Sequence, residues 1–350
     1  MSLPRSATVV ALVVGVLMVA VPLAFNLPSK TAGADNVTGA FRSTFAAGSI
    51  ARAQADIKVV DSTAKQLQSK LIPGLAHTLK MSNPQFGAFV KSHFPDVAAG
   101  VALLPKSVPY FDGVVATLAA QRGNFEKADH IPTSYLPVKV VPWLLILPGL
   151  LVVVASGLGL AGRGAWPRLA PVVSLAVGVV VVLVLLTASI SAKTTALQRF
   201  TVAFRPIFTD QGASTTVSYL DTTSKMARQF QDEAVPAVAK QLGLSPSQMA
   251  ATLRRSYPAV ASGVPQLTAQ ILPRFTALAA KIRPNIGNEK RTDAIPLAKW
   301  SARMTFWLFL IVALGLIVAG AAPLVAGRLS GAASKLDLRR AIGNVRPEGD

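Results

Sequence analysis

The chain has 350 residues, of which 51% are hydrophobic and only 15% are charged, with a formal net charge of +19. Soluble domains carry about 25% charged residues, so this composition argues against an ordinary soluble protein. The sequence contains no cysteine. Disulfides, thiolate nucleophiles, zinc–thiolate sites and iron–sulfur clusters are therefore excluded.

Four windows without any charged residue or histidine predict four transmembrane helices. The first starts at Ala7 and ends at Phe25, and the others cover 141–160, 169–190 and 306–325. About 20 apolar residues cross roughly 30 Å of hydrocarbon, and such a segment must be helical because lipid offers no partner for backbone polar groups. All four tryptophans fall near the expected membrane interfaces, as this side chain prefers: Trp143, Trp166, Trp300 and Trp307.

The first window has features of a cleaved signal peptide, namely Arg5 before it and small residues at 32–34 after it. Its apolar stretch is longer than the 7–15 residues typical of such a peptide. We therefore expect an uncleaved anchor.

Charge in the short segments predicts the orientation. The connection 161–168 has two arginines and no acid, and the basic tail 326–350 has five Lys or Arg against three acids. Positive short loops stay in the cytoplasm, whereas long domains are translocated largely regardless of charge. We expect a multi-pass protein of the cell membrane with both termini in the cytoplasm. Segments 26–140 and 191–305 would then lie outside.

A shift of 163 positions overlays the chain on itself. Ala40-Phe41-Arg42 meets Ala203-Phe204-Arg205, and FPDVAAGV at 94–101 meets YPAVASGV at 257–264. After one inserted residue, Trp143-Leu144 meets Trp307-Leu308. Residues 3–163 and 166–328 are therefore interpreted as two tandem copies. Each copy has two spans, so the copies are expected to insert in parallel. Two alternatives stay open: a duplication that enlarged a scaffold, and a pathway or binding surface at the repeat interface.

Both extramembrane segments are predicted to be helical bundles, which makes the chain an all-α integral membrane protein. Pro punctuates segments that are rich in Ala, Leu, Gln and Lys. The predicted helices are 37–68, 75–80, 85–93 and 97–121 in the first segment and 197–233, 237–242, 247–255 and 260–282 in the second. Ser245-Pro246-Ser247-Gln248 is a helix start signal, and Ser82-Asn83-Pro84-Gln85 is its counterpart.

Both segments are basic. Residues 26–140 carry 12 Lys or Arg against 7 Asp or Glu, and residues 191–302 carry 14 against 6. Such surfaces favour anionic partners such as phospholipid headgroups or acidic envelope polymers. Arg42 and Arg205 are the candidate contacts, because both copies place Arg after Ala-Phe. The alternative is a solvated basic surface with no dedicated ligand.

Aromatic residues in the first segment have two interpretations. They either line a lipid groove or, as is more common at such spacing, form core. They are Phe86, Phe89, Phe94, Tyr110 and Phe111.

No motif predicts catalysis, a cofactor, a metal site or nucleic-acid binding. The pattern G-x-G-x-x-G at 157–162 ends a membrane span and lacks the strand that a dinucleotide site needs, so its glycines are interpreted as helix-packing positions. The histidines, His77, His93 and His130, have no metal-binding spacing. Pro148-Gly149 predicts a kink in the second span.

The leading functional hypothesis is a non-catalytic accessory or scaffold subunit. It would present two basic helical domains to a membrane-protein complex or an anionic envelope component. The second hypothesis is a protein that handles or transports a lipid or another apolar molecule along the repeat interface, because uncharged spans suit that cargo better than ions. A sensor is the third, and the tail shows no output domain. High Ala, Val, Gly and Arg usage suggests a GC-rich bacterial genome.

Overall fold

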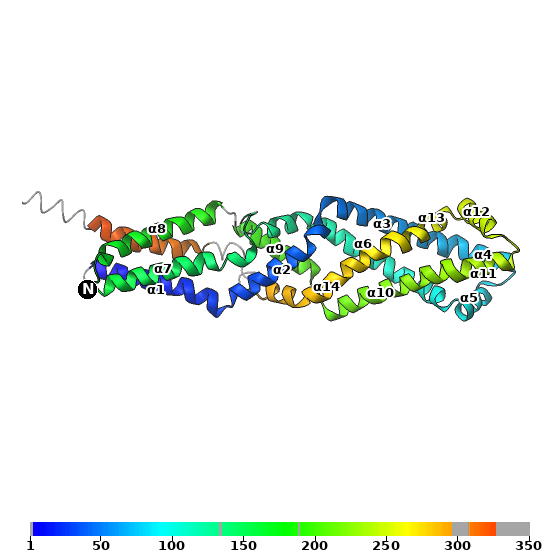
Figure 1. Cartoon of the computed structure of the whole chain (residues 1–350), viewed down its shortest axis with the longest axis horizontal. Helices are drawn as coiled ribbons and strands as arrows, with labels where there is room; N and C mark the ends of the chain where they lie inside the picture. Colours follow the sequence, from blue (N-terminus) through cyan, green and yellow to red (C-terminus); the bar gives the residue numbers. More distant parts are fainter. Residues whose placement is uncertain are drawn as a thin grey trace, which may run out of the picture. The chain divides into compact units, whose positions relative to one another are not determined.

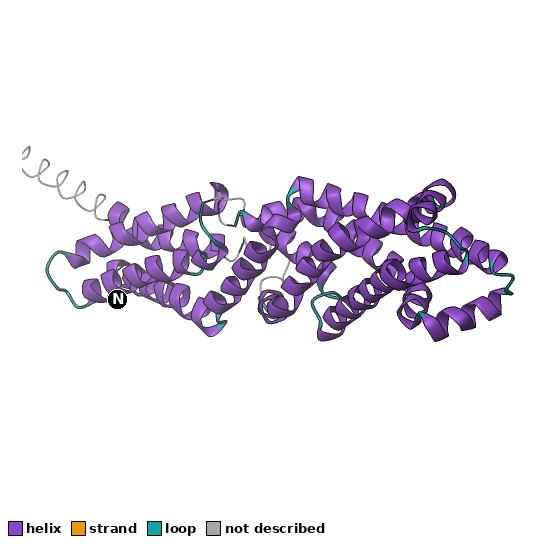
Figure 2. Cartoon of the chain, turned by 45° about the vertical axis from the view of Figure 1, so that its right-hand side comes forward, coloured by secondary structure: helices purple, strands orange, loops and turns teal. Residues whose placement is uncertain are grey.

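The structure is a computed structural model that describes residues 3–131, 133, 135–187, 190–295, 307 and 309–326. In that part of the chain the regular elements are helices, and no β-strand is present (Figure 2). The chain divides into two compact units. The span unit comprises Met1–Asp35, Lys127–Gln198 and Arg291–Asp350, and the helical unit comprises Asn36–Glu126 and Arg199–Lys290. Trp300 and the basic tail beyond 326 lie outside the described residues.

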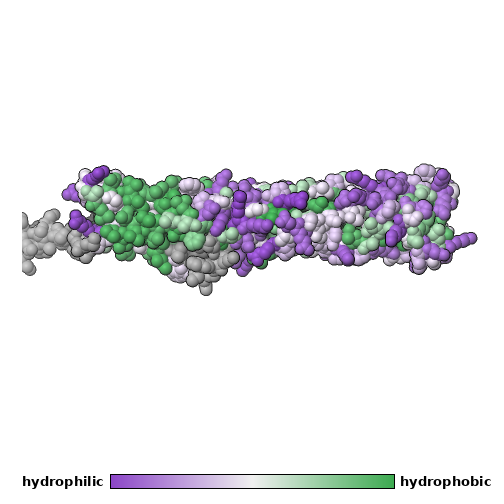
Figure 3. Space-filling view, turned by 90° about the horizontal axis from the view of Figure 1, so that it is seen from below, coloured by the Kyte–Doolittle hydropathy of each residue, from purple (hydrophilic) through white to green (hydrophobic). Residues whose placement is uncertain are grey.

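Four helices of the span unit are long and apolar enough to cross a membrane, which agrees with the four predicted spans. They are Arg5–Ala24, Val138–Leu160, Trp166–Leu186 and Phe309–Ala326. The first three belong to α1 (Leu3–Ala24), to η2 and α7 (Val138–Val140 and Trp143–Leu160) and to α8 (Trp166–Thr187), drawn in Figure 1. Apolar residues dominate the visible surface of these helices in Figure 3.

Glycines bring the span helices into close contact. A Cβ on Gly15 of α1 would lie 3.1 Å from the Gly149 carbonyl oxygen of α7. A Cβ on Gly178 of α8 would lie 2.9 Å from the Ala313 carbonyl oxygen of the fourth span. Small residues at such crossings let helix backbones approach, which drives helix association in lipid.

The glycine-rich end of α7 also packs against a neighbour. A Cβ on Gly159 would lie 3.1 Å from Ala170 Cβ of α8, whereas one on Gly157 would meet nothing within 4 Å. The helix-packing interpretation is confirmed for Gly159 and not for Gly157 or Gly162, since a Cβ on Gly162 would also meet nothing within 4 Å. Helix α7 continues through Pro148 without a break.

The outer faces of the span helices are apolar and exposed. Leu147, Leu183 and Ile311 are 61%, 54% and 66% exposed. Hydrocarbon, rather than water, suits such a surface, since a soluble monomer rarely exposes so large an apolar patch.

The remaining helices follow in two series. The first is α2 (Leu27–Phe45), α3 (Ala47–Gln66), the π-helix η1 (Leu67–Leu71), α4 (Ile72–Thr78), α5 (Asn83–His93) and α6 (Pro95–Asp129). The second is α9 (Ile190–Phe204), α10 (Asp210–Gln229), the π-helix η3 (Phe230–Ala234), α11 (Val235–Gln241), α12 (Pro246–Ser256), α13 (Pro258–Gln266), the π-helix η4 (Leu267–Ile271) and α14 (Leu272–Asp293).

Two predicted helix starts are confirmed as capping boxes. The Ser82 hydroxyl accepts from the Gln85 N–H at 3.4 Å, and the Ser82 N–H donates to the Gln85 side chain at 2.9 Å. Ser245 and Gln248 repeat both bonds at 3.3 and 2.8 Å. Each pair satisfies two N–H groups that a helix start leaves without partners.

The two long predicted helices, 37–68 and 197–233, are wrong because each is interrupted. In the second series α9 ends at Phe204, two residues before Pro206, and a proline disfavours helical backbone at the residue before it. In the first series the break falls at Ala46, whose ψ of 139° is extended. No proline marks that position, so the sequence carries no comparable signal.

The bounds of the second series repeat those of the first. α3, η1, α4 and α5 recur 163 positions later as α10, η3, α11 and α12. The last helices differ, since α6 is continuous whereas its counterpart contains η4 and ends at Asp293, 164 positions after Asp129. A π-turn accommodates one extra residue within a helix. The offset between the two series changes from 163 to 164 positions along the helix that contains η4.

Both halves of the sequence build one core in the helical unit. Leu71 and Val115 from the first half and Val260 from the second are each 1% exposed and belong to the same hydrophobic cluster. The sequence predicts one bundle for each copy, whereas Asn36–Glu126 and Arg199–Lys290 together form one compact unit. The physical reason is that each series leaves an apolar face, and burial of one against the other removes both from water.

Candidate functional site: an apolar cavity in the helical unit

The helical unit contains an apolar cavity of about 310 Å³. Drug-sized ligands bind in pockets of about 300 Å³ or more that are lined mainly by apolar side chains. Its buried lining includes Leu71, Phe86, Phe94 and Val238, all less than 9% exposed. The cavity therefore has the size and the lining of a small-molecule site.

The two halves of the sequence share the walls. Helices α5 and α6 supply one side, and Phe230, Ala234 and Val238 come from η3 and α11. The first and last residues of two π-turns line the cavity. They are Leu67 and Leu71 of η1 and Phe230 and Ala234 of η3. Short π-segments inside helices are often found at functional sites.

One charged side chain lines the cavity, Lys91 of α5. Lys91, Gly87 and Ala102 are exposed, so the cavity reaches the surface at these residues. The site therefore combines an apolar interior with a cation at its rim. That combination is complementary to an amphipathic molecule with an anionic end.

Aromatic side chains of α5 and of the residue that follows it pack against one another beside the cavity. The Phe89 ring is stacked on His93, with centroids 4.5 Å apart, and lies 6.1 Å from Phe94. Phe86, Phe89 and Phe94 line the cavity, and Phe86 and Phe94 are also buried core residues. Both interpretations of these aromatics therefore stay open.

Tyr110 and Phe111 lie elsewhere and follow the core interpretation. Phe111 is 9% exposed and its ring is 5.6 Å from Phe275, while Tyr110 packs at 5.4 Å on Tyr219.

Arg42 and Arg205 do not line the apolar cavity. Arg42 lies in the last turn of α2, Arg205 follows the end of α9, and both are exposed. Each comes directly after a buried phenylalanine. The rings beside them pair across the two halves, with Phe41 5.4 Å from Phe208 and Phe45 5.9 Å from Phe204.

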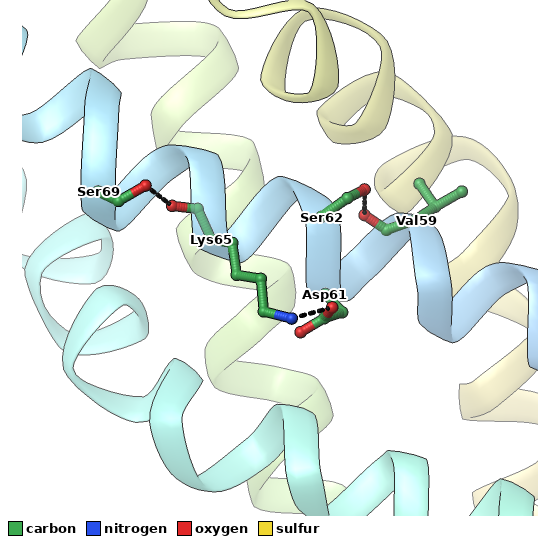
Figure 4. Close-up of polar contacts among 5 residues, drawn as sticks. All are labelled: Val59, Asp61, Ser62, Lys65 and Ser69. Atoms are coloured by element: carbon green, nitrogen blue, oxygen red, sulfur yellow. Dashed lines mark hydrogen bonds and ion pairs between the residues drawn. The ribbon is translucent and has the colours of Figure 1, made fainter.

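The exposed face of α3 and η1 is an ordinary polar surface (Figure 4). Lys65 pairs with Asp61 at 2.7 Å, and the Ser62 and Ser69 hydroxyls donate to backbone carbonyls one turn earlier. Exposed pairs of this kind contribute less than about 1 kcal/mol to stability.

Among the described residues, no three of His, Asp and Glu gather where a metal ion would bind. Comparisons with protein-family models, with curated proteins and with solved structures found no match to the chain. The cavity is therefore the feature from which a function has to be argued. Its aliphatic walls have no signal in the sequence, because Leu67 and Val238 carry no distinctive chemistry and come together only in the folded unit.

Proposed function

We propose that this chain is a membrane-anchored binding protein for a lipid or another apolar molecule with an anionic end. The observation that carries the proposal is the apolar cavity of about 310 Å³ with Lys91 at its rim. An apolar chain gains free energy on leaving water for such a cavity, at about 25 cal/mol for each Å² buried. The exposed ammonium of Lys91 would attract the anionic end. The proposed role is non-catalytic.

The proposal includes a tandem duplication, with the cavity between the copies. It is supported by the recurrence of helix bounds at 163 positions and by contacts that occur in reciprocal pairs. A Cβ on Gly100 would overlap Met226, and a Cβ on Gly263 would overlap Thr63. Gly263 is 163 positions after Gly100, and Met226 is 163 positions after Thr63, so the two contacts are equivalent. Reciprocal contacts are expected of two copies related by a pseudo-two-fold axis.

The proposed location is the cell membrane, with both termini in the cytoplasm and the helical unit outside. Support comes from the four apolar helices and from the two arginines in the short connection between α7 and α8. In this orientation the cavity would meet molecules of the cell envelope.

Photolabelling tests the binding proposal. The full chain is placed in phosphatidylcholine nanodiscs, exposed to a fatty acid with a diazirine near its methyl end, irradiated and mapped by mass spectrometry. We expect labelled peptides from α5 and from the start of α6. Labels restricted to the four spans would contradict the proposal.

Two neighbouring alanines of α6 give a matched pair of variants. Ala98 lines the cavity, whereas Ala99 is exposed and does not. Ala98→Phe should fill the cavity and remove the label from α5, and Ala99→Phe should leave it. Equal labelling of both variants would show that the label reports surface contact only.

A second candidate function is an accessory or scaffold subunit that presents a basic surface to a membrane-protein complex or an anionic envelope component. The observation that favours it is charge, because the helical unit has 20 Lys or Arg against 10 Asp or Glu. Arg42 and Arg205 remain its proposed contacts. Gentle purification followed by native mass spectrometry tests it: a stoichiometric protein partner supports this candidate, and a bound lipid alone supports the first.

A further inference from the structure

The helical unit has a second cavity of about 310 Å³, and this one is basic. Ser43, Thr44, Ser49 and Arg52 line it from the end of α2 and the start of α3, and α14 supplies Arg274 and Lys281. Three cations face one carboxylate, that of Asp56. None of these residues lines the apolar cavity, so the two sites are distinct.

The cations of the basic cavity are held in place to different degrees. The Nη1 group of Arg274 donates to both Asp56 carboxylate oxygens, at 2.8 and 3.0 Å. The Lys281 ammonium donates to the Ser43 hydroxyl at 3.0 Å and keeps further N–H groups for a ligand. Arg52 is exposed and has no hydrogen-bond or ion-pair partner among the described residues.

The corresponding positions of the other half carry no charged residue. Position 219, 163 residues after Asp56, is a tyrosine, and Arg274 is 164 residues after Tyr110. Those two tyrosine rings pack at 5.4 Å, and the Tyr110 hydroxyl bonds to Thr216 at 2.7 Å. The ion pair Asp56–Arg274 thus stands where the other half has an aromatic pair.

The helices that start at these two places, α3 and α10, also differ in how their N-termini are capped. Helix α10 is capped by the Thr209 hydroxyl, which accepts from the Gly212 N–H at 2.8 Å, and Asp210 adds a negative charge in its first turn. The N-cap of α3 is Ala46, which has no side-chain acceptor, and its first turn has no acid. Helix N-termini favour negative charge. The region at the start of α3 therefore brings together the positive helix end, three cations and the open volume, with the Asp56 carboxylate as the anion that faces them.

We propose that this basic cavity binds a phosphate-bearing anion, held by Arg52, Arg274 and Lys281 beside the uncapped start of α3. Guanidinium and ammonium groups are the usual protein ligands of phosphate, and charge-assisted hydrogen bonds are about twice as strong as neutral ones. The hydroxyls of Ser43, Thr44 and Ser49 add donors for further phosphate oxygens. The anion is either a free phosphate or a phospholipid headgroup, since both have this chemistry.

Two binding assays on the full-length chain separate the two sources. Equilibrium dialysis with radiolabelled inorganic phosphate, in neutral detergent at low ionic strength, measures the free ion. Retention of phosphatidic acid, relative to phosphatidylcholine with the same acyl chains, measures the headgroup. Binding of inorganic phosphate indicates a soluble ligand, and selective retention of phosphatidic acid alone indicates a lipid. Failure of both probes to bind overturns the proposal.

Charge-matched double variants locate the binding. Arg52→Gln with Lys281→Gln removes two cavity cations and should weaken binding at least about tenfold. Lys58→Gln with Lys106→Gln removes the same charge from exposed positions outside both cavities and should change affinity by less than about twofold. Equal weakening by both double variants would mean that net charge alone attracts the anion, and would overturn the site.

A further variant separates a loss of phosphate binding from a loss of folding. Ala46→Asp supplies the missing cap to α3 and should raise thermal stability, because Asp is among the best N-cap residues. Its carboxylate should also compete with the anion and lower phosphate affinity several-fold. Undiminished affinity in a protein that has become more stable would contradict a role for the α3 start.

Discussion

The side-chain oxygen of Gln66 accepts a hydrogen bond from the backbone N–H of Val260 at 2.9 Å. The residue 163 positions later, Gln229, does the same for Asp96 and Val97 at 2.9 and 3.1 Å. Each glutamine thus caps the start of a helix in the other half. Tyr257, at the N-cap of α13, makes no side-chain cap of its own, so the interaction replaces the usual local cap.

Removal of these caps should destabilise the helical unit. Gln66→Ala and Gln229→Ala should each lower its free energy of unfolding by about 0.5–2 kcal/mol, the usual cost of a lost N-cap. Gln66→Glu should retain most of the stability, because its carboxylate still accepts the bond and its charge suits a helix N-terminus. Thermal unfolding in detergent, followed by circular dichroism, measures the change.

Gln54→Ala serves as the control for the cap variants. Gln54 lies on the same helix as Gln66, is exposed and has no hydrogen bond in the described structure. Its replacement should change stability by less than about 0.5 kcal/mol. If Gln54→Ala and Gln66→Ala lowered the midpoint equally, helix propensity rather than the bond to Val260 would explain the loss.

Gly263→Ala should destabilise the same unit through a steric clash. The new Cβ would overlap the Thr63 side chain, and overpacking of a core costs about 1–3 kcal/mol. Thr63→Ala in the same chain should recover part of that loss, which a double-mutant cycle measures. Gly113→Ala on α6 meets nothing within 4 Å and should be neutral or stabilising by up to about 1 kcal/mol. Additive losses in the cycle would show that the two residues do not interact.

The sequence predicted those features that have a local signal. The spans follow from uninterrupted hydropathy, and the Ser82 and Ser245 caps follow from a four-residue pattern. The break at Ala46 and the π-turns at η1 and η3 have no such signal, since their residues are ordinary helix formers. Contacts between distant residues were equally hidden. Asp56 and Arg274 are 218 positions apart, and nothing in either neighbourhood indicates that they pair.

The candidate ligand contacts also divide into those with a local sequence signal and those that depend on contacts between distant residues. Arg42 and Arg205 were selected because the two halves agree at those positions. The basic cavity contains the ion pair Asp56–Arg274, whereas the corresponding positions of the other half hold the aromatic pair Tyr219–Tyr110. This difference can be recognised only in the folded structure, which brings the two members of each pair into contact. The residues that match between the two halves lie next to buried phenylalanines, whereas the proposed anion site lies where the two halves differ.

Gly149→Leu should disrupt the span unit. A Cβ at this position would lie 2.8 Å from Met18 Cβ, so a leucine would separate α1 from α7. Gly157→Leu, eight residues later on the same helix, has open space and is the matched control. We expect a lower melting temperature and proteolysis in the connection between α7 and α8 for the first variant only. Equal stability of the two variants would contradict close packing at Gly149.

The proposed orientation predicts which side of the membrane each exposed position faces. The chain has no cysteine, so a single introduced cysteine reports its own position. Ser62 is exposed on α3 and its hydroxyl makes only a local bond to the Val59 carbonyl, so Ser62→Cys should fold normally. A membrane-impermeant maleimide should label it in intact cells. Ala165→Cys, exposed in the short connection before α8, should react only after the membrane is permeabilised. The reverse pattern would place the helical unit in the cytoplasm, and both cavities would then have to draw their ligands from the cytoplasm instead of the envelope.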